Sequence, residues 1–205
     1  MLWYVEQTYQ NKWSKGRVTE QFKNKAYERK LVEPHVTEIV EKDEKLMEVF
    51  KDTLSLDFLG KIDIKDERDL KDRLLDKIIP FLQELGPGFS LVGREYKLVT
   101  PTNKNYYIDL LMYHTKIHAY VVIELKIGDF HPSDIGQLRF YINAINDLEK
   151  TELDNQTIGI LLCKTADSYA VKTTLDGIAA PIGISKYKLL EDLPNYLLEK
   201  MKTIE

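Results

Sequence analysis

The sequence predicts an α/β domain with a mixed central sheet, preceded by a small helical region. Over residues 66–85, apolar side chains recur about every 3.6 positions, which is the pattern of an amphipathic helix. Three strand-like segments follow at 89–99, 106–113 and 119–127, separated by polar turn residues. Residues 157–163 are almost wholly apolar, as in a strand buried on both faces. This succession of helix, strands, helix and strand indicates an α/β domain.

Shorter signals complete the predicted domain. Pro132 suits the first position of a helix, and an apolar face follows it along the chain. A further helix is expected at 168–175 and a short strand at 181–184. Pro80 lies inside the first amphipathic helix and predicts a bend there, because proline lacks the backbone N–H that a helix uses.

The first 53 residues predict a separate helical region. Apolar and aromatic side chains are closely spaced over residues 3–30, and Ser14 is suited to cap a second helix within this stretch. An acidic helix is expected over residues 37–51. We therefore divide the chain into a helical region, residues 1–53, and a main domain, residues 54–205.

The composition is that of a globular protein, with 43% hydrophobic and 30% charged residues. No apolar run approaches the roughly 20 residues needed to span a bilayer, and the N-terminus lacks the features of a signal peptide. The single cysteine, Cys163, excludes an internal disulfide, and the histidines lack zinc-finger spacing. These features predict a cytoplasmic protein that has no membrane partner.

The charge is unevenly distributed along the chain. The formal net charge is −4, yet residues 11–30 hold seven bases and two acids, a local charge of +5, which leaves −9 for the rest. Such a cluster is either a contact surface for nucleic acid or one solvated face of a helix. The candidate contacts with nucleic acid are Lys12, Lys15, Arg17 and Lys23.

Three charged residues on neighbouring predicted strands form the most informative pattern. Glu124 and Lys126 alternate with Leu125 along one strand, so both point to the same face. Asp109 lies in the preceding strand between apolar residues, and hairpin pairing would bring it close to Glu124. Two carboxylates so placed are hard oxygen ligands for Mg²⁺. The alternative is a buried ion pair between Lys126 and one of the acids.

Further polar residues could surround this group. Gln137 and Tyr141 are four positions apart on the next helix and share a face, where they could orient water or contact phosphate. Arg94 and Tyr96 alternate onto one face of the first strand and could also meet phosphate. An ordinary exposed polar pair is the alternative in both cases.

Residues 54–190 closely resemble the C-terminal nuclease domain of the YhcG-type bacterial proteins, a branch of the PD-(D/E)XK superfamily. The resemblance lies in an ordered series of segments: FLG at 58–60, FLQELG at 81–86, VGREY at 92–96, YIDLL at 107–111, YVVIELK at 120–126, GQLRFY at 136–141, IGILLC at 158–163 and PIG at 181–183. Residues 4–30 look like a late-starting part of the family's N-terminal helical domain, so the chain resembles a shortened member.

The resemblance implies a restriction-endonuclease-like core of α-β-β-β-α-β order and a divalent-metal phosphodiesterase. It assigns metal binding to Asp109 and Glu124, the lysine role to Lys126, and a supporting role to Gln137, with Tyr141 beside it. The proline of the family's name is replaced here by Ile108, as is usual for this branch.

The resemblance also implies an acidic residue on the helix before the sheet that points at the metal. Lys71 occupies the expected acidic position. Among the acids of that helix, Glu67, Asp69 and Asp72, this leaves Asp69 as the better candidate for a further metal ligand.

These observations together predict an endonuclease that cuts DNA with Mg²⁺ or Mn²⁺. Lys126 would stabilise developing charge while the basic N-terminal helices hold the nucleic-acid backbone. Nucleases that cut both strands often pair, so a homodimer is also expected. The alternative is a non-cleaving nucleic-acid-binding or protein-docking module on the same fold.

Overall fold

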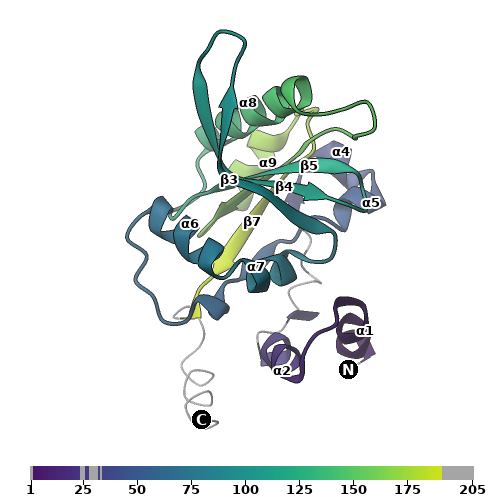
Figure 1. Ribbon diagram of the computed structural model, residues 1–205. Coiled ribbons are helices and arrows are strands. Elements are labelled where there is room, and N and C mark those ends of the chain that lie inside the picture. Colours follow the sequence, from purple (N-terminus) through teal and green to yellow (C-terminus); the bar gives the residue numbers. More distant parts are fainter. Residues whose placement is uncertain (1, 24–25, 28–31, 33, 191–205) are drawn as a thin grey trace.

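The computed structural model describes residues 2–23, 26–27, 32 and 34–190 (Figure 1). Within this part of the chain seven strands form one sheet, ordered β1-β7-β6-β5-β4-β3, with β2 also paired to β7. The strands are β1 (His35–Val36), β2 (Thr53–Ser55), β3 (Phe89–Val99), β4 (Asn105–His114), β5 (Ala119–Leu125), β6 (Ile158–Cys163) and β7 (Ile182–Lys188).

Helices precede, interrupt and flank the sheet. They are α1 (Leu2–Asn11), α2 (Lys15–Lys23), α4 (Glu38–Glu41), α5 (Glu44–Met47), the 3-10 turn η1 (Asp57–Leu59), α6 (Glu67–Asp76), α7 (Ile78–Leu85), α8 (Pro132–Leu148) and α9 (Ser168–Leu175). No helix among the described residues combines the length and apolar character that a bilayer crossing requires.

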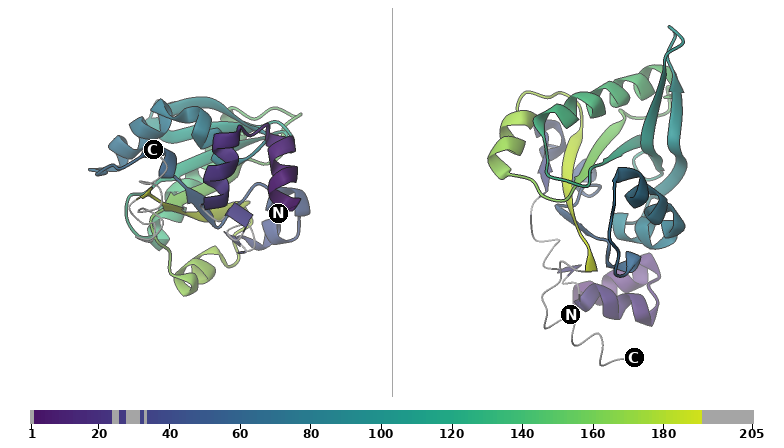
Figure 2. Two further views of the ribbon diagram at one scale, coloured as in Figure 1. Left: turned by 90° about the horizontal axis from the view of Figure 1, so that it is seen from below. Right: turned by 90° about the vertical axis from the view of Figure 1, so that its left-hand side faces the viewer.

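The sheet is mixed, as predicted. The neighbours β3/β4 and β4/β5 are antiparallel, whereas β5/β6 and β6/β7 are parallel. A parallel pair needs a long crossover connection, and α8 and α9 supply the two crossovers. The β3–β4 hairpin projects beyond the rest of the sheet (Figures 1 and 2).

Helices cover both faces of the sheet and define two apolar cores (Figure 2). One core lies under α6 and α7, where Leu70, Leu74 and Phe81 are fully buried. The other lies under α8 and α9, where Leu138 and Ile142 are fully buried. All six residues of β6 are buried, because this strand lies inside the sheet with a core on each side.

The central prediction of the fold is confirmed. The segments predicted at 89–99, 106–113 and 119–127 are β3, β4 and β5, and their ends differ from the prediction by two residues at most. The expected helices and strand that follow them are α8, β6 and α9. The last strand, β7, was predicted too short, since it runs on to Lys188.

The helix predicted over residues 66–85 is two helices rather than one bent helix. The chain breaks at Lys77, whose φ of −116° and ψ of 36° are not helical. Pro80 is therefore the third residue of α7. Backbone N–H groups in the first turn of a helix have no acceptor within the helix, so proline removes no helical hydrogen bond here. Proline here marks the start of a new helix.

The predicted boundary between residues 53 and 54 is wrong. Strand β1 pairs with β7 in antiparallel fashion and β2 pairs with it in parallel, so the chain from residue 34 onward already belongs to the sheet domain. The acidic helix predicted over residues 37–51 is also wrong, because α4 and α5 are separate. Asp43 lies between them, and its side chain accepts hydrogen bonds from the backbone N–H groups of Lys45 and Leu46.

The helical character predicted for the N-terminal residues is confirmed in α1 and α2. The Ser14 hydroxyl accepts a hydrogen bond from the backbone N–H of Arg17 at 3.2 Å, which is the contact expected of an N-cap. The predicted continuation of α2 toward residue 30 falls largely outside the described residues.

Glu84 links the N-terminal helices to the sheet domain. Its side chain is 2% exposed and lies on α7. It accepts hydrogen bonds from Gln21 Nε2 at 3.1 Å and from Arg17 Nη2 at 3.3 Å, both on α2, and from the backbone N–H of Ser55 at 2.9 Å. One buried carboxylate therefore joins α2, α7 and β2.

We expect Glu84→Ala to lower the free energy of unfolding by about 3–5 kcal/mol, because it removes a buried carboxylate that pairs with Arg17 and accepts hydrogen bonds from Gln21 and Ser55. The neighbouring exposed Gln83→Ala is the matched control and should change it by less than about 0.5 kcal/mol. Urea unfolding measures both. Equal stabilities of the two variants would contradict the assigned role of Glu84.

Candidate active site

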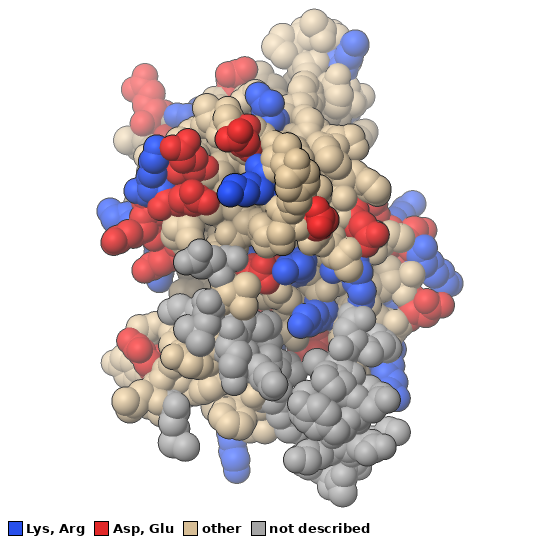
Figure 3. All heavy atoms as spheres, turned by 180° about the vertical axis from the view of Figure 1, so that it is seen from behind, with Lys and Arg blue, Asp and Glu red and all other residues tan. Residues whose placement is uncertain are grey.

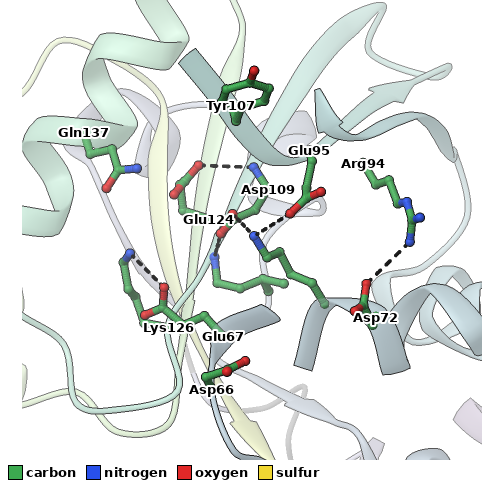
Figure 4. Close-up of polar contacts among 12 residues, drawn as sticks. Asp66, Glu67, Asp72, Arg94, Glu95, Tyr107, Asp109, Glu124, Lys126 and Gln137 are labelled. Carbon is green, nitrogen blue, oxygen red and sulfur yellow. Dashed lines mark hydrogen bonds and ion pairs between the residues drawn. The ribbon is translucent and has the colours of Figure 1, made fainter. Parts of the chain in front are cut away.

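Asp109 and Glu124 lie side by side at the point where β4 and β5 separate (Figure 4). Pairing between these strands runs from His114↔Ala119 to Leu110↔Ile123 and stops there. Beyond it, the backbone N–H of Asp109 points to Glu124 Oε1 at 3.5 Å, and Asp109 Oδ2 accepts a hydrogen bond from the backbone N–H of Leu125 at 2.9 Å. The hairpin therefore brings the two acids together, as the sequence predicted.

Glu124 is held in an environment that opposes its negative charge. The side chain is 2% exposed, on a strand whose other residues are mainly apolar. Burial, and then the negative charge of Asp109, raises the pKa of Glu124 to about 8, although Lys126, the N–H of Asp109 and Lys71 act in the opposite direction. The positive charges already present do not compensate fully for burial and repulsion.

Lys71, on α6, supplies the nearest cation to Asp109. Its ammonium lies 2.9 Å from Asp109 Oδ1 and 3.6 Å from Glu95 Oε1, and its side chain is 15% exposed. Burial alone would lower the pKa of Lys71. The hydrogen bond and the charge of Asp109, with smaller contributions from Glu95 and Glu124, outweigh that effect and raise it.

Lys126 follows β5 and faces α6. Its ammonium lies 3.6 Å from Glu67 Oε2, and its side chain is 20% exposed. Its backbone N–H donates to the carbonyl of Leu162 on β6 at 2.8 Å, so the neighbouring strand fixes the chain at this point. Lys126 is close enough to act on the charge of Glu124, as the pKa of Glu124 shows.

Gln137 and Tyr141 occupy successive turns of α8 beside the acids. Gln137 Nε2 donates to the Tyr141 hydroxyl at 3.3 Å, and this hydroxyl donates to the backbone carbonyl of Tyr107 at 3.0 Å. Burial raises the pKa of Tyr141. The hydrogen bond from Gln137 acts to lower this pKa, and the charges of Glu124 and Asp109 act to raise it further. The chain of hydrogen bonds ties α8 to β4 at the site.

The residues present fit a divalent cation. Asp109 and Glu124 offer adjacent carboxylate oxygens, the ligands that Mg²⁺ and Mn²⁺ prefer, and a cation between them would offset the repulsion that helps to raise the pKa of Glu124. Within the described part of the chain, no three His, Cys, Asp or Glu side chains are grouped closely enough to hold a metal. The protein would therefore supply two carboxylates, and water or substrate oxygens the other ligands.

The sequence matches the family described as YhcG PDDEXK nuclease domain over residues 47–202, which is well over half of the chain. The chain belongs to this family.

The YhcG protein of Escherichia coli (strain K12) is 27% identical to this member of the family over 192 residues. The match covers 91% of this chain and 51% of that protein, so the chain spans about half the length of its curated relative.

Two solved structures resemble the fold distantly. A repair endonuclease from Pyrococcus abyssi covers 65% of this chain and 50% of its own, with 15% identity and a TM-score of 0.41. The EndoMS protein in an EndoMS–dsDNA complex covers 58% of this chain and 44% of its own, with 20% identity and a TM-score of 0.41.

Among the helix acids of this YhcG-family domain, Glu67 faces the site, and the choice of Asp69 is not supported. Both oxygens of Asp69 are engaged near its own helix: Oδ1 pairs with Arg73 Nε at 2.8 Å, and Oδ2 accepts the N–H of Lys65 at 3.2 Å. The sequence could have indicated Glu67. Glu67 and Lys71 are four residues apart and therefore share a helix face, whereas Asp69 lies on a different face.

The expectation that Arg94 and Tyr96 share a face is wrong. Glu95 between them has a φ of 39°, so the alternation of side chains breaks at this point. Arg94 is 60% exposed and lies 3.5 Å from Asp72 on α6. Tyr96 instead packs into the core under α8, and burial together with a hydrogen bond to Glu149 raises its pKa to about 12.

Two other residues expected to bind nucleic acid are buried. Arg17 is 7% exposed and pairs with Glu84, and Tyr141 is 5% exposed. Each fills a structural position because its polar group has a partner inside the protein. Lys12 and Lys15 are exposed, and the side chain of Lys23 lies outside the described part of the chain. On the face shown in Figure 3, basic and acidic side chains are interspersed.

We expect the stability of Glu124→Gln relative to the parent protein to increase with pH. The folded-state pKa of Glu124 is raised from 4.5 to about 8, so the folded state binds a proton that the unfolded state has lost, and the parent loses stability as pH rises through this window. Above pH 8 the Tm of Glu124→Gln should exceed that of the parent by at least about 2–4 °C, which corresponds to about 1 kcal/mol.

Thermal unfolding between pH 5 and pH 9 without divalent metal measures this difference. The exposed Glu41→Gln on α4 is the control, and its difference from the parent should stay constant. A constant difference for Glu124→Gln as well would contradict the raised pKa.

Proposed function

We propose that this chain is a metal-dependent nuclease that hydrolyses phosphodiester bonds in nucleic acid, with DNA as its substrate. The observation that carries the proposal is that Asp109 and Glu124 are adjacent where β4 and β5 separate, with Lys126 directly after the end of β5. Membership of a nuclease-domain family supports the same chemistry.

The roles follow from the charges and positions of the residues. Asp109 and Glu124 would hold Mg²⁺ or Mn²⁺. A divalent cation bound there would neutralise charge on the scissile phosphate and lower the pKa of an attacking water molecule. The Lys126 ammonium is available to stabilise the negative charge that develops on the phosphate. The Gln137 amide, oriented by Tyr141, can hydrogen-bond a water molecule or a phosphate oxygen.

The β3–β4 hairpin provides a surface beside the site for the nucleic acid. Arg94 and Tyr107 project from it and are 60% and 54% exposed. Tyr107 is two residues before Asp109, and its backbone is held by Tyr141. An exposed aromatic ring at this place can stack on a base, and the guanidinium of Arg94 can contact phosphate. Lys12 and Lys15 of the N-terminal helices would add backbone contacts.

Two copies of the site, one for each strand, would allow a duplex to be cut in a single binding event, and we include a homodimer in the proposal for that reason. The alternative function is a non-cleaving nucleic-acid-binding or protein-docking module. Two observations favour it: Lys71 already neutralises Asp109, and a third acidic ligand is lacking among the described residues. Calorimetric titration with Mn²⁺ separates the two functions, because a module whose site has been lost would bind no metal.

The direct test is cleavage of plasmid, linear and branched DNA by the purified chain in Mg²⁺ or Mn²⁺. We expect Asp109→Ala and Glu124→Ala to abolish cleavage, Lys126→Met to reduce kcat by about 10²–10³-fold, and chelation of the metal to stop the reaction. Glu41→Ala on exposed α4 should leave the rate unchanged. Cleavage that persists in both carboxylate variants would rule out the assigned site.

We further expect Tyr107→Ala to weaken the binding of single-stranded DNA by about 1–3 kcal/mol, the contribution of one base stacked on an aromatic ring. Tyr169→Ala is the matched control, since Tyr169 is 80% exposed on α9 and lies outside the proposed surface. Fluorescence anisotropy in Ca²⁺ measures both affinities. Equal affinities would exclude Tyr107 from the binding surface.

A further inference from the structure

Lys71 places one positive charge beside three acids of the site. Its ammonium contacts Asp109 at 2.9 Å and Glu95 at 3.6 Å, and the charge of Glu124 also acts on it. Each Asp109 oxygen already accepts one hydrogen bond: Oδ1 from the Lys71 ammonium and Oδ2 from the N–H of Leu125. A divalent cation bound to Asp109 would lie within a few ångströms of this ammonium, so the two cations compete for the same carboxylate.

The two positive charges cannot share that carboxylate without strong repulsion, because the interaction of like charges a few ångströms apart is large in a partly buried site. Lys71 is only 15% exposed and lies on a helix packed against the sheet, so its ammonium would remain close to the metal unless its side chain turned away. The ammonium then needs another acceptor within reach of its side chain.

Glu95 is placed to be that acceptor. In the β3–β4 register Arg94 pairs with Leu110 and Tyr96 with Ile108, which leaves Glu95 opposite Asp109. Its φ of 39° is uncommon for a residue with a side chain and marks local strain of the kind found at functional sites. The Glu95 side chain is 52% exposed, so Lys71 can turn outward toward it and stay neutralised.

We propose that Lys71 is a built-in counter-cation that holds Asp109 before metal binds, and that Glu95 receives its ammonium when a divalent cation takes its place. This inference rests on the proposed metal-dependent function and concerns how the same site is loaded. Lys71 keeps the adjacent carboxylates together in the metal-free protein and makes metal binding weaker than the ligands alone would give. Lys71 and Glu95 are positioning residues in this scheme.

The test is calorimetric titration of the full chain with Mn²⁺, without nucleic acid. Lys71→Met should tighten Mn²⁺ binding about tenfold or more, because the competing charge is gone. Glu95→Gln should weaken binding about five- to tenfold, because the displaced ammonium has no acceptor. Lys77→Met removes an exposed lysine at the end of the same helix and should change the affinity less than about twofold.

The double variant Lys71→Met/Glu95→Gln distinguishes displacement from a simple change of charge. If Glu95 serves only to receive Lys71, Glu95→Gln should have little effect once Lys71 is methionine. An equal weakening in both backgrounds would mean that Glu95 attracts the metal directly, which overturns the proposed exchange. Thermal unfolding of each variant verifies that it is folded.

The remaining outcomes separate this inference from the proposed function. If every variant except Asp109→Ala binds Mn²⁺ with the parent's affinity, Lys71 does not compete and the inference fails while the metal site stands. If neither the parent nor Lys71→Met binds Mn²⁺, the metal site itself fails, and the inference with it.

Discussion

The repulsion between two neighbouring carboxylates, one of them buried, is the constraint around which this site is arranged. Glu124 enters the interior because β5 is an apolar strand between two cores, and Asp109 meets it because β4 and β5 separate directly beyond Leu110. The fold offsets the repulsion with Lys71, with Lys126 and with the N–H of Leu125, yet the pKa of Glu124 remains raised. The metal binding proposed for this site would supply the positive charge that these groups leave short.

The position of α6 follows from the same constraint. Leu70 and Leu74 bury one side of the helix against the sheet, while Glu67 and Lys71 on a neighbouring side reach Lys126 and Asp109. The buried leucines set which side of the helix faces the sheet. The same rotation places Lys71 against Asp109, and a rotated helix would leave this partly buried acid without the ammonium.

The N-terminal helices depend on a second buried carboxylate. Glu84 joins α2 to α7 and β2. Arg17, a member of the basic cluster, is buried and pairs with Glu84 instead of facing solvent. The cluster is therefore divided, because one of its members anchors the helices while others, such as Lys15, are exposed. Charge counted along the sequence cannot separate these uses, since burial is decided by what packs against each residue.

The sequence by itself determined the order of the central elements and the placement of Asp109 and Glu124 on adjacent strands, because the periodicity of apolar residues fixes both. It could not determine that β1 and β2 complete the sheet, since two- and three-residue strands have no periodicity to read. Only the tertiary structure decided which side chains of α6 face the acids, and that Glu95 breaks the alternation of β3. Those outcomes depend on helix rotation and on one unusual backbone angle, which arise from contacts between segments distant in the chain.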